Sequence, residues 1–137
     1  LGVNCSHHKL VAEMEFGFWR FLFSTNQFFA CGQTLLKIFP NKPKSNKSIQ
    51  YNHSYVFDEL RKVNNLRNRI AHHEPICFGT GTMSIDTGYA RDLYSIILVL
   101  FQWMEIDEKT LMHGLDHVLI VCDEIDALKS TVPPSSR

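Results

Sequence analysis

At 137 residues, with 45% hydrophobic and 20% charged side chains, the chain has the length and composition of one globular domain with a substantial core. Its 14 Lys and Arg residues balance its 14 Asp and Glu residues, so bulk charge does not indicate a nucleic-acid binder, and any such site must come from local clustering. No apolar run is long enough to span a membrane and no signal-sequence pattern opens the chain, so we expect a cytoplasmic protein.

The cysteines indicate the redox state of the thiols, and the first residue bears on whether the sequence is partial. Cys5, Cys31, Cys77 and Cys122 are scattered through apolar or helical segments, which predicts reduced thiols rather than a disulfide framework. The chain opens on Leu1 rather than on Met, and we interpret it as a trimmed or partial sequence.

The N-terminal third is predicted to be a leader, residues 1–8, followed by a long helix over residues 9–38. Most of the ten Phe residues lie in this part of the chain, so we expect the helix to be heavily buried. Gly17 and the triplet at 24–26 are weak points, which leaves open either two helices or one kinked helix. The spacing of an amphipathic face is kept by Val11, Met14, Phe18, Phe21, Phe28, Cys31 and Leu35.

A loop over residues 40–50, rich in Pro, Asn, Ser and Lys, precedes a second helix predicted over residues 54–72. Pro75 ends this helix, because the residue before a proline avoids helical geometry. Its apolar stripe consists of Val56, Leu60, Val63 and Ile70.

The C-terminal half predicts a loop or short hairpin over residues 76–88 and two further helices, at about 87–104 and 108–128. The glycines at 79 and 81 lack the preceding strand and the spacing of a nucleotide-binding loop, so we discount that interpretation. The acidic clusters at 105–108 and 123–126 are interpreted as a helix start and a solvated face. The pattern predicts an all-α helical bundle of four to five helices over residues 9–130, with a disordered tail at 131–137.

The segment NNLRNRIAHHEP, residues 64–75, carries the residues with chemistry. On a helical wheel Arg67 falls within the apolar stripe, where a guanidinium is costly unless paired. It is either a structural residue satisfied by a carboxylate such as Glu13 or Glu15, which wheel geometry favours, or a phosphate ligand in a cleft. The opposite, polar stripe consists of Arg61, Asn65, Asn68 and His72.

His72 likewise has two interpretations. A protonated histidine at the C-terminal end of a helix interacts favourably with the helix dipole, which is a purely structural role. An imidazole also titrates close to neutral pH and can act as a general acid or base. The neighbouring Arg67, Asn68, Arg69 and His73 give the catalytic interpretation more weight than a lone histidine would have.

Three blocks of this sequence resemble the Abi-like (abortive-infection) family of the HEPN superfamily. LRNRIAHHEPI, residues 66–76, resembles the family's hallmark and contains the HEPN spacing of Arg, a polar residue and His. LVAEMEFGFWRFLF, residues 10–23, resembles its FGFW region, and LLKIFPN, residues 35–41, its FP segment. Residues 101–116 resemble a later helix, so the likeness covers most of residues 10–120. The family's usual portion ahead of the FGFW block is absent or nearly so, which fits a short member or a chain lacking that part.

This resemblance implies an HEPN-like helical bundle and a metal-independent endoribonuclease that acts as a homodimer in antiphage defence. RNA would be cleaved by attack of its 2′-hydroxyl on the adjacent phosphate, with Arg67, Asn68 and His72 as catalytic residues and no cofactor. An antitoxin protein or small RNA is a further expected partner. Residues expected to bind RNA or phosphate are Arg61, Asn65, Arg69 and His73.

Helix geometry adds a reason to expect the dimer. At about 100° per residue, Asn68 and His72 are i, i+4 neighbours, whereas Arg67 and His72 lie about 140° apart. Arg67 and His72 can share one phosphate only if the helix unwinds before Pro75 or if a second copy completes the site.

Two alternatives stay open. A non-catalytic HEPN module for dimerisation or RNA binding fits the same resemblance. A metal site has suitable donor types but no compact ligand spacing, and adjacent histidines on a helix diverge, so we expect none. The donors concerned are Cys5, His7, His8, His72, His73 and Cys77.

Overall fold

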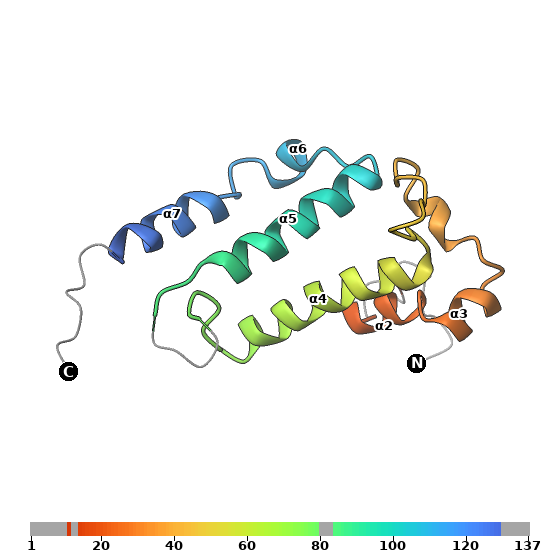
Figure 1. Cartoon of the computed structure of the whole chain (residues 1–137), viewed down its shortest axis with the longest axis horizontal. Coiled ribbons are helices and arrows are strands. Elements are labelled where there is room, and N and C mark those ends of the chain that lie inside the picture. The colour runs from red at the N-terminus through yellow and green to blue at the C-terminus, as the bar shows by residue number, and fades with distance from the viewer. Residues whose placement is uncertain (1–10, 12–13, 80–83, 130–137) are drawn as a thin grey trace. The chain divides into compact units, whose positions relative to one another are not determined.

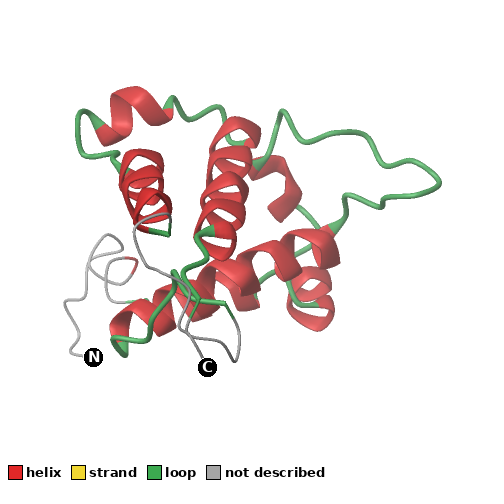
Figure 2. Cartoon of the chain, turned by 60° about the vertical axis from the view of Figure 1, so that its left-hand side comes forward, coloured by secondary structure: helices red, strands yellow, loops and turns green. Residues whose placement is uncertain are grey.

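The computed structural model describes residue 11 and residues 14–79 and 84–129. Within these residues the regular structure is helical, and the single β feature is an isolated antiparallel bridge between Phe78 and Ile85. Figures 1 and 2 show the helices and the connecting loops. The all-α class predicted from the sequence is therefore confirmed, with six α-helices among the described residues rather than four or five.

Over residues 14–38 the chain forms three short helices, so the prediction of one or two long helices is wrong for this part of the segment. They are α2 (Phe16–Phe21), α3 (Thr25–Ala30) and the 3-10 helix η1 (Leu35–Ile38). The weak point at 24–26 is a true boundary, because Ser24 is the N-cap of α3.

Gly32 explains the end of α3. With a φ of 71°, Gly32 adopts the left-handed conformation that glycine takes at little cost. Its amide donates to the Phe29 carbonyl and the Gln33 amide to the Phe28 carbonyl, both at 3.0 Å. This double hydrogen bond is the Schellman motif that closes helix C-termini.

The first helices are less buried than expected. No residue of α2 is buried, and Phe18 and Phe21 are exposed. Phe28 of α3 is buried and stacks on His53, with ring centroids 4.5 Å apart. His53 Nδ1 also lies 3.1 Å from the Phe23 carbonyl oxygen. The aromatic core of this region therefore centres on α3 and the start of α4.

The two central helices were predicted to within about one residue at each end. They are α4 (His53–Ala71) and α5 (Gly88–Trp103). On α4, Val56 is fully buried, whereas Ile70 at the other end of the predicted apolar stripe is 53% exposed. The buried face of α5 consists of Ala90, Leu93, Leu100 and Trp103.

The last predicted helix is two helices, α6 (Glu108–Met112) and α7 (Val118–Leu128), so the expectation of one continuous helix is wrong. Gly114, with a φ of 73°, breaks the run where apolar spacing alone suggests continuation. The acidic cluster before α6 is a helix start as predicted. There Asp107 is the N-cap and accepts hydrogen bonds from the Lys109 amide and the Thr110 hydroxyl, and these bonds lower the pKa of Asp107.

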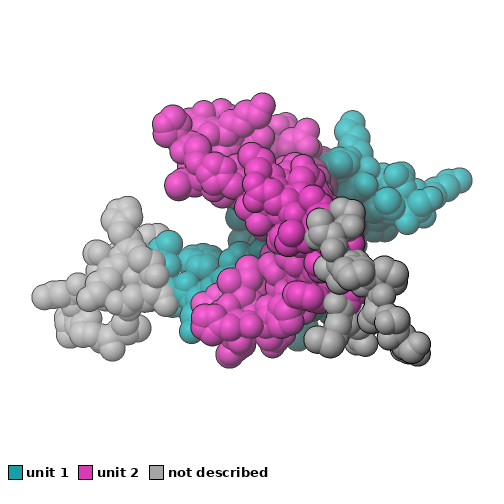
Figure 3. Space-filling view, turned by 90° about the vertical axis from the view of Figure 1, so that its left-hand side faces the viewer, with its two compact units in different colours: residues 1–38, 43–64 teal, residues 39–42, 65–137 magenta. Residues whose placement is uncertain are grey.

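Where one domain is expected over residues 9–130, the chain divides into two compact units (Figure 3). One comprises residues 1–38 and 43–64, and the other residues 39–42 and 65–137. α4 runs from the first unit into the second. The predicted leader at 1–8 and tail at 131–137 lie outside the described residues. In the part of the chain that the structure describes, every helix is too short or too polar to cross a bilayer.

Candidate functional site

The candidate site lies at the C-terminal end of α4, where helical hydrogen bonding continues through His72. The His72 amide donates to the Asn68 carbonyl at 2.9 Å, as in an α-helix. The next amide, that of His73, donates to Ile70 at 3.0 Å, and the Glu74 amide donates to Arg69 at 2.8 Å. These last two bonds form a Schellman motif with His73 in the left-handed position. His73 and this motif, rather than Pro75 alone, end the helix.

Arg67 is exposed, although the wheel places it within the apolar stripe. Its Nη1 donates to Asn68 Oδ1 at 3.2 Å, and both residues belong to the second unit. The expectation of a buried Arg67 is therefore wrong, and Glu13, one of the two carboxylates expected to hold it, lies outside the described residues. Exposure removes the desolvation cost that favoured a structural role, and the planar donor group is presented to solvent.

Arg69, predicted to contact phosphate, has its donors engaged within the chain. Its Nε donates to Glu74 Oε2 at 3.2 Å and its Nη2 to the Pro75 carbonyl at 2.5 Å. Its Cζ lies 4.8 Å from the centre of the Tyr89 ring on α5, within cation–π range. Arg69 therefore fixes the turn after α4 to α5, a role that pattern analysis of α4 alone did not reveal.

The remaining predicted residues are divided between the two units. His72, His73 and Asn65 are exposed and belong to the second unit with Arg67 and Asn68. Arg61 belongs to the first unit and pairs with Asp58 at 3.0 Å, both side chains being about half exposed. Exposed pairs of this kind contribute little to stability and leave the guanidinium available to an anion.

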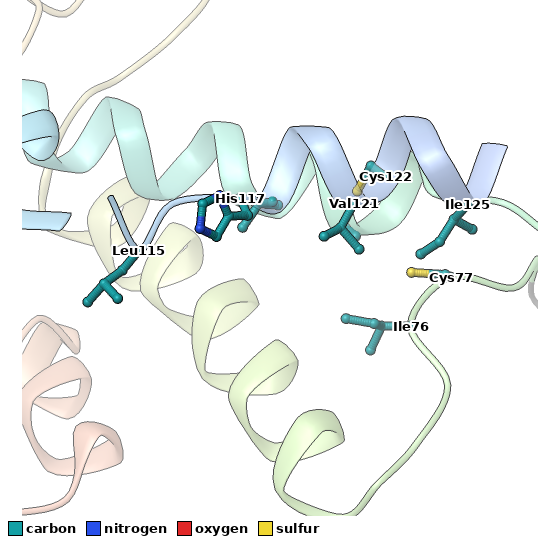
Figure 4. Close-up of a pocket in the computed structure, with 9 residues that line it drawn as sticks. Ile76, Cys77, Leu115, His117, Val121, Cys122 and Ile125 are labelled. Atoms are coloured by element: carbon teal, nitrogen blue, oxygen red, sulfur yellow. The ribbon is translucent and has the colours of Figure 1, made fainter. Parts of the chain in front are cut away.

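A pocket of about 310 Å³, not predicted from the sequence, follows the candidate site along the chain (Figure 4). Ile76 and Cys77, just after α4, face α7 across it, and all lie in the second unit. Burial raises the pKa of the Cys77 thiol, with Cys122 and Asp126 adding to the rise. The lining on the other side includes Leu115, Val118, Val121 and Ile125. The sequence feature that could have indicated this pocket wall is the run VLIVCDEI, residues 118–125, which is apolar on more than one helical face.

In the acidic cluster of α7, Asp123 and Glu124 are exposed as expected from the sequence, whereas Asp126 is partly buried. The buried Thr87 donates its hydroxyl to Asp126 Oδ2 at 2.6 Å and accepts from Arg91 Nε at 3.0 Å. Arg91 Nη2 also reaches Asp123 at 2.6 Å and Asp126 at 3.0 Å. Hydrogen bonds from Thr87, Lys129 and Arg91 lower the pKa of Asp126 to about 2. This cluster holds α7 beside α5.

A second link fixes the turn before α7. The Tyr94 hydroxyl on α5 donates to Asp116 Oδ2, and this bond raises the pKa of Tyr94 to about 12. The turn carries Leu115 and His117, two residues that line the pocket. The pocket wall is therefore held at both ends of α7.

The residues of the two site types that the sequence argues against, a metal centre and a nucleotide-binding loop, are described only in part. Among the described residues no three His, Cys, Asp or Glu side chains group as metal ligands, while Cys5, His7 and His8 lie outside them. The Gly79 amide donates to the Ser84 carbonyl at 3.0 Å beside the bridge between Phe78 and Ile85, and residue 81 is not described.

Comparison of the chain with models of protein families, with curated proteins and with solved structures found no match.

Proposed function

We propose that this chain is a metal-independent endoribonuclease of the HEPN class and the Abi-like family, with a site formed between two copies. Arg67 of one copy and His72 of the other act on the same phosphodiester of an RNA. The observation that supports this most directly is the hydrogen bond from the His72 amide to Asn68, which shows α4 still wound at the histidine.

That winding decides between the two geometries open to the motif. If α4 unwound before His72, one chain could turn both side chains toward one phosphate. Since it does not, Arg67 and His72 remain about 140° apart around the helix. Both side chains are exposed, so each is accessible to a second copy, and a composite site is the arrangement that uses both.

The chemistry follows from the two side chains. The RNA 2′-oxygen forms a bond to the adjacent phosphorus as it loses its proton, and the bond from phosphorus to the 5′-oxygen breaks. The products are a 2′,3′-cyclic phosphate and a 5′-hydroxyl end. His72 serves as the general acid or base, and the Arg67 guanidinium stabilises the added negative charge on the phosphoryl oxygens. Asn68 contacts Arg67 and orients it.

The test is cleavage of a long single-stranded RNA by the purified protein in excess EDTA, with analysis of the new ends. We expect cyclic phosphate and 5′-hydroxyl ends, and a loss of rate of roughly 10²-fold or more in Arg67→Ala and in His72→Ala.

The matched control is His113→Ala, because His113 is also an exposed histidine at the end of a helix. This variant should cleave at the wild-type rate. Cleavage that survives in both Arg67→Ala and His72→Ala, or that stops in EDTA, would end the assignment.

A second candidate is a non-catalytic module for dimerisation or RNA binding. The exposed apolar side chains of α7 favour it, because such a surface indicates a protein partner. RNA binding that is lost in Arg67→Ala, with no cleavage by the wild-type protein under any condition tested, would identify this function instead.

In the cell, the proposed activity belongs to antiphage defence and would be toxic when unrestrained. Expression of the wild-type chain should stop growth, and His72→Ala should relieve that arrest. An antitoxin protein or a small RNA that restrains the chain should bind wild type and His72→Ala alike. Equal toxicity of the two chains would contradict a role for cleavage.

A further inference from the structure

The first unit holds a concentration of positive charge that the balanced totals of the chain conceal. Residues 16–57 contain five of the 14 Lys and Arg residues and none of the 14 Asp and Glu residues. Four of the five belong to the first unit, and they are Arg20, Lys37, Lys44 and Lys47. A block of one charge sign is typical of a surface that binds a polyanion.

Two of these residues, Lys44 and Lys47, belong to the loop of residues 43–52, which we call the lysine loop. Both are exposed, and among the described residues neither takes part in an ion pair. The acidic side chains that α4 adds to the same unit are already neutralised within that helix. The pairs are Asp58 with Arg61 at 3.0 Å and Glu59 with Lys62 at 2.7 Å. The positive charge of the loop is therefore left to solvent, where phosphate groups can neutralise it.

The lysine loop is held in one conformation by its own hydrogen bonds. The side-chain oxygen of Asn46 accepts from the Ser48 and Ile49 amides, both at 2.8 Å. The Asn46 amide donates to the Ile49 carbonyl at 2.9 Å. The Tyr51 amide donates to the Ser45 hydroxyl oxygen at 2.9 Å. Asn stabilises turns through such contacts with the backbone, and a loop that is ordered before binding loses less conformational entropy when it meets a ligand.

An aromatic pair follows the loop directly. The rings of Tyr51 and Tyr55 are in edge contact, with centroids 4.9 Å apart and an interplanar angle of 61°. Both residues are partly exposed. The hydrogen bond from Tyr51 to Ser45 ties this pair to the residue next to Lys44. One short segment of the first unit therefore combines positive charge with accessible rings, as surfaces that bind single-stranded nucleic acids do.

We propose that the lysine loop and the Tyr51–Tyr55 pair form a binding surface for single-stranded RNA. Lys44 and Lys47 contact phosphate groups, and the tyrosine rings stack on unpaired bases. This inference goes beyond the proposed function, because the surface belongs to the first unit and requires neither cleavage nor a second copy.

The composition of the loop favours RNA over an anionic membrane as the partner. A segment that binds a bilayer interface buries large apolar side chains in it. The tip of the lysine loop is polar instead, and its large apolar side chain, that of Ile49, is only 40% exposed. The polar residues of the tip are Ser45, Asn46, Ser48 and Gln50. Such a tip suits contact with a hydrated phosphate backbone.

The test measures binding of a fluorescein-labelled oligouridine by anisotropy over a range of salt concentrations. The full chain carries His72→Ala and the buffer contains EDTA, so that cleavage does not interfere. Lys44→Gln and Lys47→Gln should each weaken binding. Each should also reduce the slope of log affinity against log salt by about 0.7, the value for one phosphate contact with a single strand.

The rings have a separate signature, because stacking depends little on salt. Tyr51→Leu, which keeps an apolar side chain beside Tyr55, should weaken binding by roughly 5-fold or more. The slope against salt should stay as it is without this substitution. Circular dichroism confirms that each variant is folded.

The matched control is Lys109→Gln, which changes the net charge by the same amount at an exposed lysine of the second unit. It should leave the slope unchanged. Equal slopes in Lys44→Gln, Lys47→Gln and Lys109→Gln would show that only net charge matters, and would overturn the proposal.

Three other results would overturn it as well. They are unchanged affinity in Tyr51→Leu, duplex RNA bound as tightly as the oligouridine, and capture of the chain by phosphatidylserine vesicles through the two lysines without oligouridine binding. A chain that binds with the expected pattern, but whose wild type never cleaves RNA, would leave this surface standing and contradict the proposed function alone.

Discussion

His73 adopts a backbone conformation that disfavours its own side chain. Its φ of 56° lies in the left-handed region, which costs a non-glycine residue about 1–2 kcal/mol. The Schellman hydrogen bonds from the His73 and Glu74 amides hold it there. At α3 the corresponding position is occupied by Gly32, as the motif usually requires. The sequence showed an exposed histidine but gave no sign of this strain.

We therefore expect His73→Gly to stabilise the protein. Relief of the strain is partly offset by the greater freedom of glycine in the unfolded chain, about 0.4–1 kcal/mol, which leaves a net gain of roughly 0.5–1 kcal/mol. Urea unfolding followed by circular dichroism measures it. His73→Ala is the control, since alanine keeps a Cβ and should give no such gain. Equal unfolding free energies for the two variants would contradict the strain.

Arg69→Lys separates the structural role of Arg69 from the phosphate contact predicted for it. Lysine keeps the positive charge but lacks the planar donor group that serves Glu74, the Pro75 carbonyl and the Tyr89 ring together. We expect a loss of roughly 1 kcal/mol in the free energy of unfolding, with unchanged salt dependence of RNA binding. If Arg69→Lys keeps full stability but binds RNA more weakly, Arg69 contacts phosphate as the sequence predicted.

At the scale of elements, the pairing of α5 with α7 depends on Asp126. Hydrogen bonds from Thr87, Lys129 and Arg91 hold its pKa near 2, below the ordinary value of 3.8. Because the folded-state pKa is the lower one, ionised Asp126 stabilises the fold fully above about pH 4. That contribution disappears as the pH falls through about 2.

Asp126→Asn should therefore lower the free energy of unfolding at pH 6, and the gap from wild type should narrow between pH 4 and pH 2. Unfolding titrations across this range measure the gap. Asp92→Asn, an exposed aspartate on the same helix as Arg91, is the control and should show no such convergence. A gap that stays constant with pH would rule out ionised Asp126 as the cause.

The elements also show how far the sequence was predictive. α4 and α5 were located because an apolar period that is regular over about five turns identifies a helix even where single residues do not fit it. The runs that follow α3 and α6 kept that period across Gly32 and Gly114, whose left-handed conformations break the helix. Asp126 was interpreted as solvated because its partners Thr87 and Arg91 lie 39 and 35 residues away. Periodicity carries no information on pairs at that separation.

The position of the candidate residues along the chain was predicted in part. The prediction located Arg67, Asn68 and His72 at the end of one helix, and the structure places them there. The wheel suggested a buried Arg67 because it assigned the whole stripe to the core. Instead that stripe is buried at Val56 and exposed at Ile70. The packing of other elements decides which part of an amphipathic face is buried. The sequence of the helix itself therefore does not predict it.

At the scale of the whole molecule, the account requires two copies to share one site, and mixing two inactive variants tests this most directly. Arg67→Ala and His72→Ala should each fail to cleave RNA alone. After exchange of subunits, roughly half of the dimers are mixed, and each mixed dimer has one intact site of two. The mixture should then recover roughly a quarter of the wild-type rate. Mixed dimers that form and remain inactive would contradict a site built from Arg67 of one copy and His72 of the other.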